Sequence, residues 1–336
     1  MSYARLSQLA FGHMNAQILY AAVSLGVPEA LARGPVSAVV VADTIGCDPA
    51  GLARLLRALI VLGVAAEVTP GRLTLAEMGR PLCADHPRSM RSSVLLLGHP
   101  ATWRAWGALA DGVRAGVDAF GHAHGRPLFR YLADDAELSA VFNTAMGEGT
   151  EPIAAAVPLA YDFRDGRTVV DVGGGNGTLL AAVLAAVPQA CGILYDSDTG
   201  SAHAAETFRR SGLAGRCRVV AGDFFAAVPA GDTMLLKGIL HDWDDRRCVT
   251  ILRNCRRSIA VDGRLLVLEP VLPDRLGAAE AAAAVLSDIA MLVYTGGRER
   301  TEAEFRALLA DGGFSLTEVT PPVAGSATRI LAAAPA

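Results

Sequence analysis

Three residues in the second half of the chain have side chains suited to proton transfer. His241 lies in the polar and aromatic run 237–245, Glu269 follows an apolar run, and Glu299 lies in Gly-Gly-Arg-Glu-Arg-Thr at 296–301. A histidine oriented by carboxylates can act as a general base, because the acid fixes its tautomer and stabilises the imidazolium. His241, Glu269 and Glu299 are therefore the predicted catalytic residues.

These assignments have structural alternatives. A lone histidine such as His241 is more often structural than catalytic. Glu299 could instead belong to a salt-bridge cluster with Arg298 or Arg300. This alternative is weaker for Glu269.

A glycine-rich run, Asp-Val-Gly-Gly-Gly-Asn-Gly at 171–177, follows an apolar strand pattern. Glycines let the backbone pass close to a ligand, and the following helix N-terminus offers free N–H groups. Gly173, Gly175 and Gly177 give G-x-G-x-G, whereas the dinucleotide fingerprint needs a glycine where Thr178 stands. A glycine loop alone is weak support for any ligand.

Acidic residues at the next two strand ends add to the glycine loop. Asp196 lies about 20 residues beyond it, where a ribose diol is bound in such folds. An alternative is that Asp196 or Asp198 caps a helix. Asp223 and Phe224 follow the third strand, and an acid beside an aromatic ring suits an adenine. Together these residues predict an adenosine pocket without a pyrophosphate.

The second half alternates between strand and helix patterns. Strands are predicted at 169–172, 192–195, 218–221, 233–237, 264–269, 314–319 and 328–333, and helices at 178–187, 201–211, 246–259, 280–294 and 302–311. This alternation predicts a doubly wound α/β sheet. Ligands bind beyond the carboxyl ends of such strands, so the residues above should share one edge.

The first hundred residues have a winged-helix pattern. Helices are predicted at 6–32 with a break at 26–28, at 36–45 and at 48–62, followed by a hairpin of 65–68 with 73–75. Asp48 is the predicted cap of the third of these helices. Arg54 and Arg57 stand among mostly apolar residues, which argues against a DNA-reading helix. The pattern favours packing against another protein surface.

Further helices are predicted between residues 89 and 150. One helical face is expected to pack in the core; it carries Trp103, Trp106, Leu109 and Val113. The predicted division is a winged-helix-like dimerisation domain at 1–100, a helical connector contributing to the substrate pocket at 101–163, and a catalytic domain at 164–336.

Composition limits the class of protein. The chain of 336 residues is 52% hydrophobic and 19% charged with a net charge of −4, which excludes disorder and argues against nucleic acid as a partner. The six cysteines lack metal-ligand spacing, as expected for thiols of a reducing cytoplasm. His122 and His124 have no carboxylate or cysteine set nearby and are expected in a loop, so no metal is predicted. The uncharged stretches are too short or too interrupted to predict a membrane span.

These motifs resemble those of the S-adenosylmethionine-dependent O-methyltransferases of the plant caffeate type and their actinobacterial relatives in aromatic polyketide tailoring. The resemblance covers nearly the whole chain and is strongest at 171–177, 222–225, 236–243 and 296–301. The His-Asp-Trp run at 241–243 is its most selective part.

The resemblance implies S-adenosylmethionine as cofactor, no metal, and a homodimer built by the winged-helix region. It implies that His241 is the base, flanked by Glu269 and Glu299. The residues implied to bind the cofactor are Gly173 at the methionine part, Asp196 at the ribose, and Asp223 and Phe224 at the adenine. Lys237 is implied to lie beside the bound cofactor, and Asp171 and Gly175 belong to the glycine-rich run. Those implied to line the pocket of a phenolic or enolic acceptor are Phe142, Met146 and Met291.

One departure and three alternatives stay open. The family usually continues Leu-Pro after the ribose acid, whereas this chain has Ser197, Asp198 and Thr199, so Asp198 could compete with Asp196. Some relatives methylate nitrogen, and others decarboxylate or hydroxylate without methyl transfer. A winged-helix regulator that senses a metabolite is an alternative from a different class.

Overall fold

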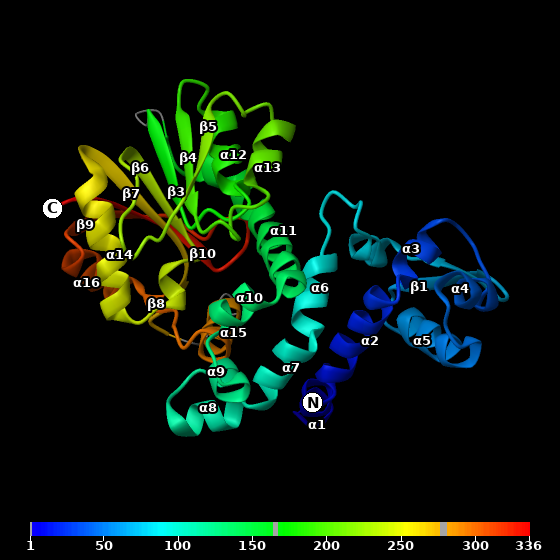
Figure 1. Cartoon of the computed structure of the whole chain (residues 1–336). Helices are drawn as coiled ribbons and strands as arrows, with labels where there is room; N and C mark the ends of the chain where they lie inside the picture. The colour runs from blue at the N-terminus through cyan, green and yellow to red at the C-terminus, as the bar shows by residue number, and fades with distance from the viewer. Residues whose placement is uncertain (1, 164–166, 276–280) are drawn as a thin grey trace. The chain divides into compact units, whose positions relative to one another are not determined.

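The structure is a computed structural model that describes residues 2–163, 167–275 and 281–336 (Figure 1). The chain divides into two units, one of Met1–Trp103 with Ala140–Glu148 and one of Arg104–Ser139 with Gly149–Ala336. Two helices contribute residues to both units: α7 (Pro100–Gly107) and α11 (Ala136–Ala160). The three-part division predicted from the sequence, 1–100, 101–163 and 164–336, stays a prediction.

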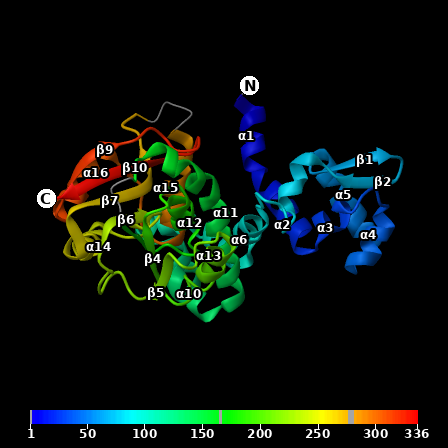
Figure 2. The ribbon, with the colours of Figure 1, turned by 90° about the horizontal axis from the view of Figure 1, so that it is seen from above.

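The first unit has the predicted order of helices followed by a hairpin. Its elements before α7 are α1 (Ser2–Ala10), α2 (Gly12–Ser24), α3 (Val27–Ala32), α4 (Ala38–Ile45), α5 (Pro49–Val61), β1 (Ala65–Thr69), β2 (Arg72–Leu75), the 3₁₀ helix η1 (Glu77–Leu82) and α6 (Arg91–Gly98). Strands β1 and β2 pair antiparallel, and Figure 2 shows them beside α5. The predicted cap is confirmed, because the Asp48 carboxylate accepts a hydrogen bond from Gly51 N at 2.7 Å.

The helices that precede the sheet in the sequence differ from one expectation. They are α7, α8 (Leu109–Ala115), α9 (Ala119–His124), α10 (Leu128–Asp134) and α11. The predicted apolar face is wrong as a core face, because α7 ends at Gly107 and a new helix starts at Leu109. Trp103, Trp106 and Val113 are 37%, 36% and 62% exposed.

The second unit contains the predicted doubly wound sheet. Its strands are β3 (Thr168–Val172), β4 (Cys191–Asp196), β5 (Cys217–Ala221), β6 (Gly231–Lys237), β7 (Ile259–Leu272), β8 (Arg300–Thr301), β9 (Phe314–Val319) and β10 (Thr328–Pro335). The order is β5-β4-β3-β6-β7-β10-β9, with β8 beside β7. Strands β3 to β7 are mutually parallel, whereas β10 runs antiparallel to β7 and β9.

Helices cover both faces of this sheet. They are α12 (Thr178–Ala186) and α13 (Ala204–Arg210) on one face, and α14 (Asp245–Ser258) and α16 (Glu302–Asp311) on the other. Helix α15 (Ala281–Tyr294) packs against α8, α9 and β7, and a short 3₁₀ turn η2 (Leu240–Asp242) follows β6. Val169 packs with α12 and α13, whereas Val170 packs with α14 and α16. Figures 1 and 2 show these helix pairs on opposite sides of the sheet. Because neighbouring residues of a strand face opposite ways, each buried strand needs apolar residues on both faces.

Two strand assignments differ from those expected. Strand β7 begins at Ile259, where the sequence predicts the last residue of a helix, and it continues to Leu272, so Glu269 lies within the strand and not at its end. Strand β8 was not predicted. None of the helices in the described part of the chain combines the length and apolar character that a bilayer span requires.

Candidate active site

The turn that carries His241 is fixed by a neighbouring strand. Gly238 has a φ of +62°, which lets the chain turn sharply at the end of β6. Strands β6 and β7 pair with Lys237 opposite Leu268, so Glu269 lies one residue beyond the end of β6. Glu269 Oε1 accepts hydrogen bonds from Ile239 N at 2.9 Å and Leu240 N at 2.8 Å. The carboxylate thereby holds the amide side of the turn.

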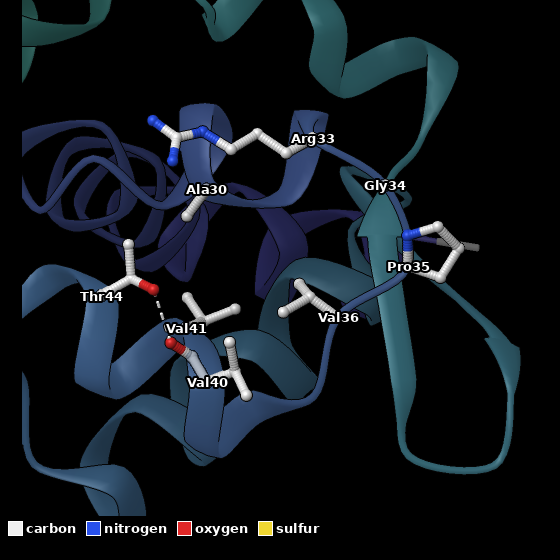
Figure 3. Close-up of a pocket in the computed structure, with 8 residues that line it drawn as sticks. All are labelled: Ala30, Arg33, Gly34, Pro35, Val36, Val40, Val41 and Thr44. Carbon is white, nitrogen blue, oxygen red and sulfur yellow. Dashed lines mark hydrogen bonds between the residues drawn. The ribbon is translucent and has the colours of Figure 1, made fainter.

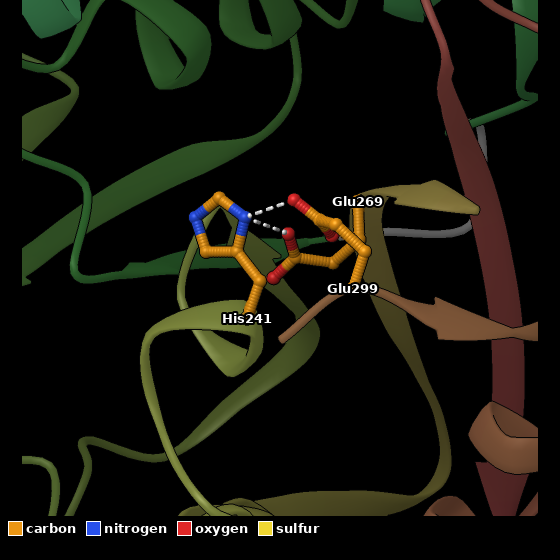
Figure 4. A group of neighbouring side chains, drawn as sticks. All are labelled: His241, Glu269 and Glu299. Atoms are coloured by element: carbon orange, nitrogen blue, oxygen red, sulfur yellow. Dashed lines mark hydrogen bonds and ion pairs between the residues drawn. The ribbon is translucent and has the colours of Figure 1, made fainter. Parts of the chain in front are cut away.

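The three predicted catalytic side chains meet in one cluster, hereafter the histidine cluster (His241, Glu269 and Glu299). His241 Nδ1 lies 2.9 Å from Glu299 Oε1 and 3.4 Å from Glu269 Oε2. The two carboxylates are fully buried, whereas the imidazole is 17% exposed. Figure 4 shows Nε2 on the side of the ring away from both carboxylates. The acids therefore fix one ring nitrogen and leave the other available.

The electrostatics of the cluster favour a proton on His241. Burial alone would lower the pKa of the imidazole, but the charge of Glu269 and the hydrogen bond to Glu299 outweigh it and raise this pKa to about 10. Burial also raises the pKa of Glu269, although the charge of His241 opposes that change. At neutral pH the raised pKa therefore favours an imidazolium at His241, against the two glutamates.

Two residues of α15 support Glu299 and were missed in the sequence. Ser287 Oγ donates to Glu299 Oε1 at 2.6 Å, and Glu299 N donates to Asp288 Oδ1 at 2.9 Å. The only sequence signal was a Ser-Asp pair within an otherwise apolar helix pattern. Nothing in that pattern connects α15 to Glu299.

The alternative salt-bridge cluster for Glu299 is wrong. Arg298 pairs with Glu304 at 2.6 Å and Asp245 at 3.2 Å, and Arg300 pairs with Asp245 at 2.7 Å. Among the described residues, neither arginine forms an ion pair with Glu299. The cation that Glu299 contacts is the imidazole.

In the described part of the chain, the histidine cluster is also the one group of ligand atoms close enough to share a metal ion, within 4.8 Å. His241 Nδ1 and Glu299 Oε1 are hydrogen-bonded to each other at 2.9 Å. His122 and His124 belong to no such group. The expectation that they lie in a loop is wrong, because both lie in the last turn of α9.

The glycine run forms a left-handed loop at the end of β3. Gly173, Gly175 and Gly177 have φ values of +71°, +56° and +80°, which L side chains rarely adopt. Asp196, at the end of β4, accepts Gly175 N through Oδ2 at 2.8 Å and Ser197 N through Oδ1 at 2.6 Å. Asp196 therefore contacts the loop, as its predicted place requires.

Asp198 is exposed and lies apart from the contacts that Asp196 makes with the glycine loop. The carboxylate at the loop is thus Asp196, and its burial raises its pKa.

A buried carboxylate lies beneath the loop. Asp171 is 1% exposed, and its Oδ2 has no hydrogen-bond partner among the described residues. Burial and the nearby charge of Asp196 raise the pKa of Asp171 to about 7. Lys237 is half-buried, and its Nζ donates to Thr150 Oγ1 at 3.0 Å. An unpartnered buried carboxylate oxygen is costly, and Oε2 of Glu269 and of Glu299 are unpartnered in the same way, so each of these oxygens can accept a further donor.

The loop after β5 brings an aromatic ring toward the glycines. Phe224 Cε1 lies 3.8 Å from the position of a Cβ on Gly173. Asp223 Oδ1 accepts Phe225 N at 2.8 Å. Asn254, a buried residue of α14 that the sequence did not single out, donates to the carbonyls of Phe224 and Phe225 at 2.9 Å each. These hydrogen bonds fix the loop that carries both predicted adenine residues.

The predicted acceptor-pocket residues are divided between the units. Met291 lies on α15 in the second unit, four residues after Ser287. Phe142 and Met146 lie on α11 within the stretch that belongs to the first unit, where Phe142 is half-buried and Met146 is 46% exposed. Their joint role at an acceptor stays a prediction.

A cavity of about 390 Å³ lies within the first unit (Figure 3). Its lining consists of Ala30, Arg33, Gly34, Pro35, Val36, Val40, Val41 and Thr44. Arg33 is the one charged side chain among them, and none of the predicted site residues is included.

Two family models match the chain. The O-methyltransferase domain matches residues 106–315, and the O-methyltransferase dimerisation domain matches residues 7–85.

Several curated relatives match over almost the whole chain. The O-demethylpuromycin-O-methyltransferase of Streptomyces alboniger is 39% identical over 98% of this chain and 89% of its own length. The phenazine O-methyltransferase PhzM of Lysobacter antibioticus is 39% identical over 95% of this chain and 93% of its own length. The 8-amino-8-demethylriboflavin N,N-dimethyltransferase of Streptomyces davaonensis is 37% identical over 90% of this chain and 88% of its own length.

Solved structures match as well. The crystal structure of LaPhzM has a TM-score of 0.94 at 38% identity, covering 99% of each chain. The O-methyltransferase NcsB1 of neocarzinostatin biosynthesis, in complex with S-adenosylmethionine and 2-hydroxy-5-methyl naphthoic acid, has a TM-score of 0.80 at 32% identity, covering 96% of each chain. The chain therefore belongs to this O-methyltransferase family, and it is an S-adenosylmethionine-dependent O-methyltransferase.

Proposed function

We propose that this enzyme methylates a phenolic or enolic hydroxyl of a small aromatic or polyketide-type natural-product intermediate, with His241 as the general base. The observation that carries the proposal is the geometry of the histidine cluster. Nδ1 faces Glu299 and Glu269 at 2.9 and 3.4 Å, and Nε2 lies on the other side of the ring (Figure 4). A base held in this way presents one defined nitrogen to the acceptor.

The raised pKa of His241 suits a phenol as acceptor. An ordinary imidazole near 6.5 and a phenol near 10 differ by about 3.5 pKa units, or about 5 kcal/mol, against proton transfer. With the pKa of His241 at about 10, the imidazole and a phenol hold a proton about equally well. The carboxylates therefore remove most of the penalty for proton transfer. Because the imidazole is mostly protonated at pH 7, the reactive state becomes more populated as the pH rises.

The aspartates and glycines of the first two strand ends hold the cofactor in this proposal. Asp171 has an unpartnered buried oxygen, and Asp196 accepts three hydrogen bonds, from Gly175 N and from the amide and hydroxyl of Ser197, which leaves capacity for one further donor. These acceptors suit the ammonium and hydroxyl donors of S-adenosylmethionine, and the left-handed glycines keep side chains out of its way. Asp223 and Phe224 hold the adenine, and Lys237 lies beside the cofactor. When bound, S-adenosylmethionine supplies an activated methyl group, so the protein has to align the acceptor and hold its proton.

Phe142, Met146 and Met291 line the acceptor pocket in the proposed enzyme. The naphthoic acid in the NcsB1 complex is an aromatic hydroxy acid, which supports an aromatic acceptor here. Regions 1–100, 101–163 and 164–336 supply the dimer contact, part of the pocket and the cofactor site.

The proposed partner of the first unit is a second copy of the chain in the cytoplasm. The match to a dimerisation domain supports this assembly. Five apolar side chains within residues 3–14 are 52% to 84% exposed: Tyr3, Leu6, Leu9, Phe11 and Met14. A large exposed apolar patch is unusual on a monomer.

N-methylation is the second candidate function. One relative, at 37% identity, is named as an N,N-dimethyltransferase, so the family scaffold accommodates amine acceptors. The test is transfer of label from methyl-labelled S-adenosylmethionine to matched phenols and anilines. Label on the phenols alone supports the proposal, and label on the anilines alone supports the second candidate. No label on either acceptor, with the cofactor bound, contradicts both.

A further inference from the structure

Arg300 is a fully buried cation next to the catalytic turn. Its side chain is 0% exposed, although it carries a permanent charge. Nη1 donates to Leu240 O at 3.0 Å and Nη2 donates to Trp243 O at 2.9 Å. Nε and Nη2 both donate to Asp245 Oδ1, at 3.0 and 2.7 Å. The guanidinium thus binds the backbone immediately before and after residues 241 and 242.

Residues next to Arg300 in the sequence make further contacts with the same turn. Arg298 N donates to His241 O at 2.9 Å. A Cβ on Gly297 would overlap His241 O, so this position has room for glycine only. Donors within residues 297–300 therefore hydrogen-bond to the carbonyls of Leu240, His241 and Trp243. The Glu269 carboxylate accepts hydrogen bonds from the amides of the same turn.

A buried guanidinium makes the turn hard to displace. A charge removed from water is tolerated only where its donors are hydrogen-bonded, so losing the turn carbonyls would leave an uncompensated cation. Arginine suits this place because its planar fork reaches several acceptors at fixed angles. A lysine ammonium would keep the charge without the fork.

We propose that Arg300 is a positioning residue that fixes the carbonyl side of the catalytic turn, so that His241 keeps Nδ1 between the glutamates and Nε2 toward the acceptor. The proposal rests on the proposed role of His241 as the base. Arg300 itself touches no reacting atom, so its effect should fall on turnover and not on cofactor binding.

The test compares Arg300→Ala with a matched control, Arg216→Ala. Arg216 also donates to backbone carbonyls, those of Leu184, Val187, Pro188 and Ala190, but these lie around the end of α12. Both variants should unfold at lower temperature than the parent. Only Arg300→Ala should lower kcat, by about 100-fold, because a displacement of about 1 Å at the reacting groups has that effect. Its KM for S-adenosylmethionine should not change.

Two further readouts separate positioning from general destabilisation. Millimolar guanidinium, but not sodium at equal ionic strength, should restore part of kcat in Arg300→Ala. Arg300→Lys should retain the fold but not the activity. The ¹⁵N NMR signals of the His241 ring should show that the hydrogen bond at Nδ1 breaks in Arg300→Ala and persists in Arg216→Ala.

The outcomes distinguish this proposal from the proposed function. A parental kcat and parental His241 signals in Arg300→Ala, or an equal fall of kcat in both arginine variants, would overturn the positioning role. If Arg300→Ala does not fold, parental kcat and signals in Arg300→Lys overturn it instead. Parental turnover in His241→Ala would contradict the proposed base, whereas the NMR result would still report whether Arg300 positions the ring.

Discussion

Two groups of buried carboxylates lie at the carboxyl edge of the same sheet and differ in what they face. In the histidine cluster, Glu269 and Glu299 face an imidazole. In the second group, hereafter the aspartate pair (Asp171 and Asp196), Asp196 faces the amides of Gly175 and Ser197 and the Ser197 hydroxyl. Each group keeps buried oxygens with no hydrogen-bond partner among the described residues, Oδ2 of Asp171 in one and Oε2 of Glu269 and of Glu299 in the other. The two groups therefore differ in their counter-charge: the histidine cluster holds its own imidazole against the carboxylates, whereas Asp196 is held by hydrogen bonds from the backbone.

The pKa values reflect this difference. Burial raises the pKa of Asp171 to about 7, because the charge of Lys237 does not offset the loss of water. In the histidine cluster the carboxylates instead raise the pKa of His241 to about 10. The histidine cluster therefore holds its proton on a ring nitrogen, where a methyl acceptor can reach the ring. The aspartate pair offers carboxylate oxygens as hydrogen-bond acceptors to a cofactor.

The largest effect is expected from His241→Ala. Removal of the base should lower kcat by about 10²- to 10⁴-fold. The dissociation constant of S-adenosylmethionine, measured by calorimetry, should stay unchanged because the aspartate pair is intact. Near-parental turnover in the folded variant would mean that the histidine cluster is structural.

Glu299→Gln should change both the rate and the pH dependence. With one negative charge fewer, the pKa of His241 should fall from about 10 toward its ordinary value, because Glu299 contributes to the increase. The rise of kcat/KM with pH should therefore shift to lower pH, with a lower plateau.

Glu304→Gln is the matched control for this shift. Glu304 lies next to the same motif but pairs with Arg298. It should leave the midpoint of the profile in place, and an identical midpoint in Glu299→Gln would contradict the account.

Asp196→Asn should have the opposite pattern to His241→Ala: weaker cofactor binding with little change in kcat. Loss of a charged acceptor should weaken S-adenosylmethionine binding by about tenfold, as for hydrogen bonds to charged groups. At saturating cofactor, kcat should be close to that of the parent. Asp198→Asn, at the exposed neighbouring acid, should change neither quantity. A loss of kcat in Asp196→Asn with unchanged affinity for S-adenosylmethionine would contradict a role of the aspartate pair in cofactor binding.

The smallest effect concerns stability and pH. The folded-state pKa of Asp171, about 7, exceeds its ordinary value of 3.8, so the folded protein binds more protons between these values than the unfolded chain. The contribution of this residue to stability is therefore present below pH 4 and lost as the pH rises through 7. Thermal unfolding of Asp171→Asn should show a weaker decline over this range than the parent. An equal decline of thermal stability in Asp171→Asn and in the parent would mean that a group other than Asp171 titrates over this range.

The sequence predicted those parts of the site that depend on strand order. His241, Asp196 and the glycine loop each follow or end a parallel strand, and Glu269 lies within β7 just past the last residue that pairs with β6, so the pairing of these strands brings the residues together. Once the alternation of strands and helices is recognised, these residues must lie at one edge.

Contacts that depend on side-chain packing could not be predicted in this way. Ser287 and Asp288 reach Glu299 from α15, whose sequence indicates only an apolar helix. Arg300 looked like a partner of Glu299 because both lie in one motif, but its fork extends to Leu240 O and Trp243 O, about 60 positions away. Neither periodicity nor charge pattern records which acceptors a buried arginine reaches.

The most direct test of the central claim is a crystal structure of the enzyme with S-adenosylhomocysteine and a phenolic acceptor. The account predicts the acceptor oxygen within about 2.6–3.2 Å of His241 Nε2, with Nδ1 still between Glu299 and Glu269. An acceptor oxygen held by another group, or an imidazole that turns Nε2 away from it, would contradict the account.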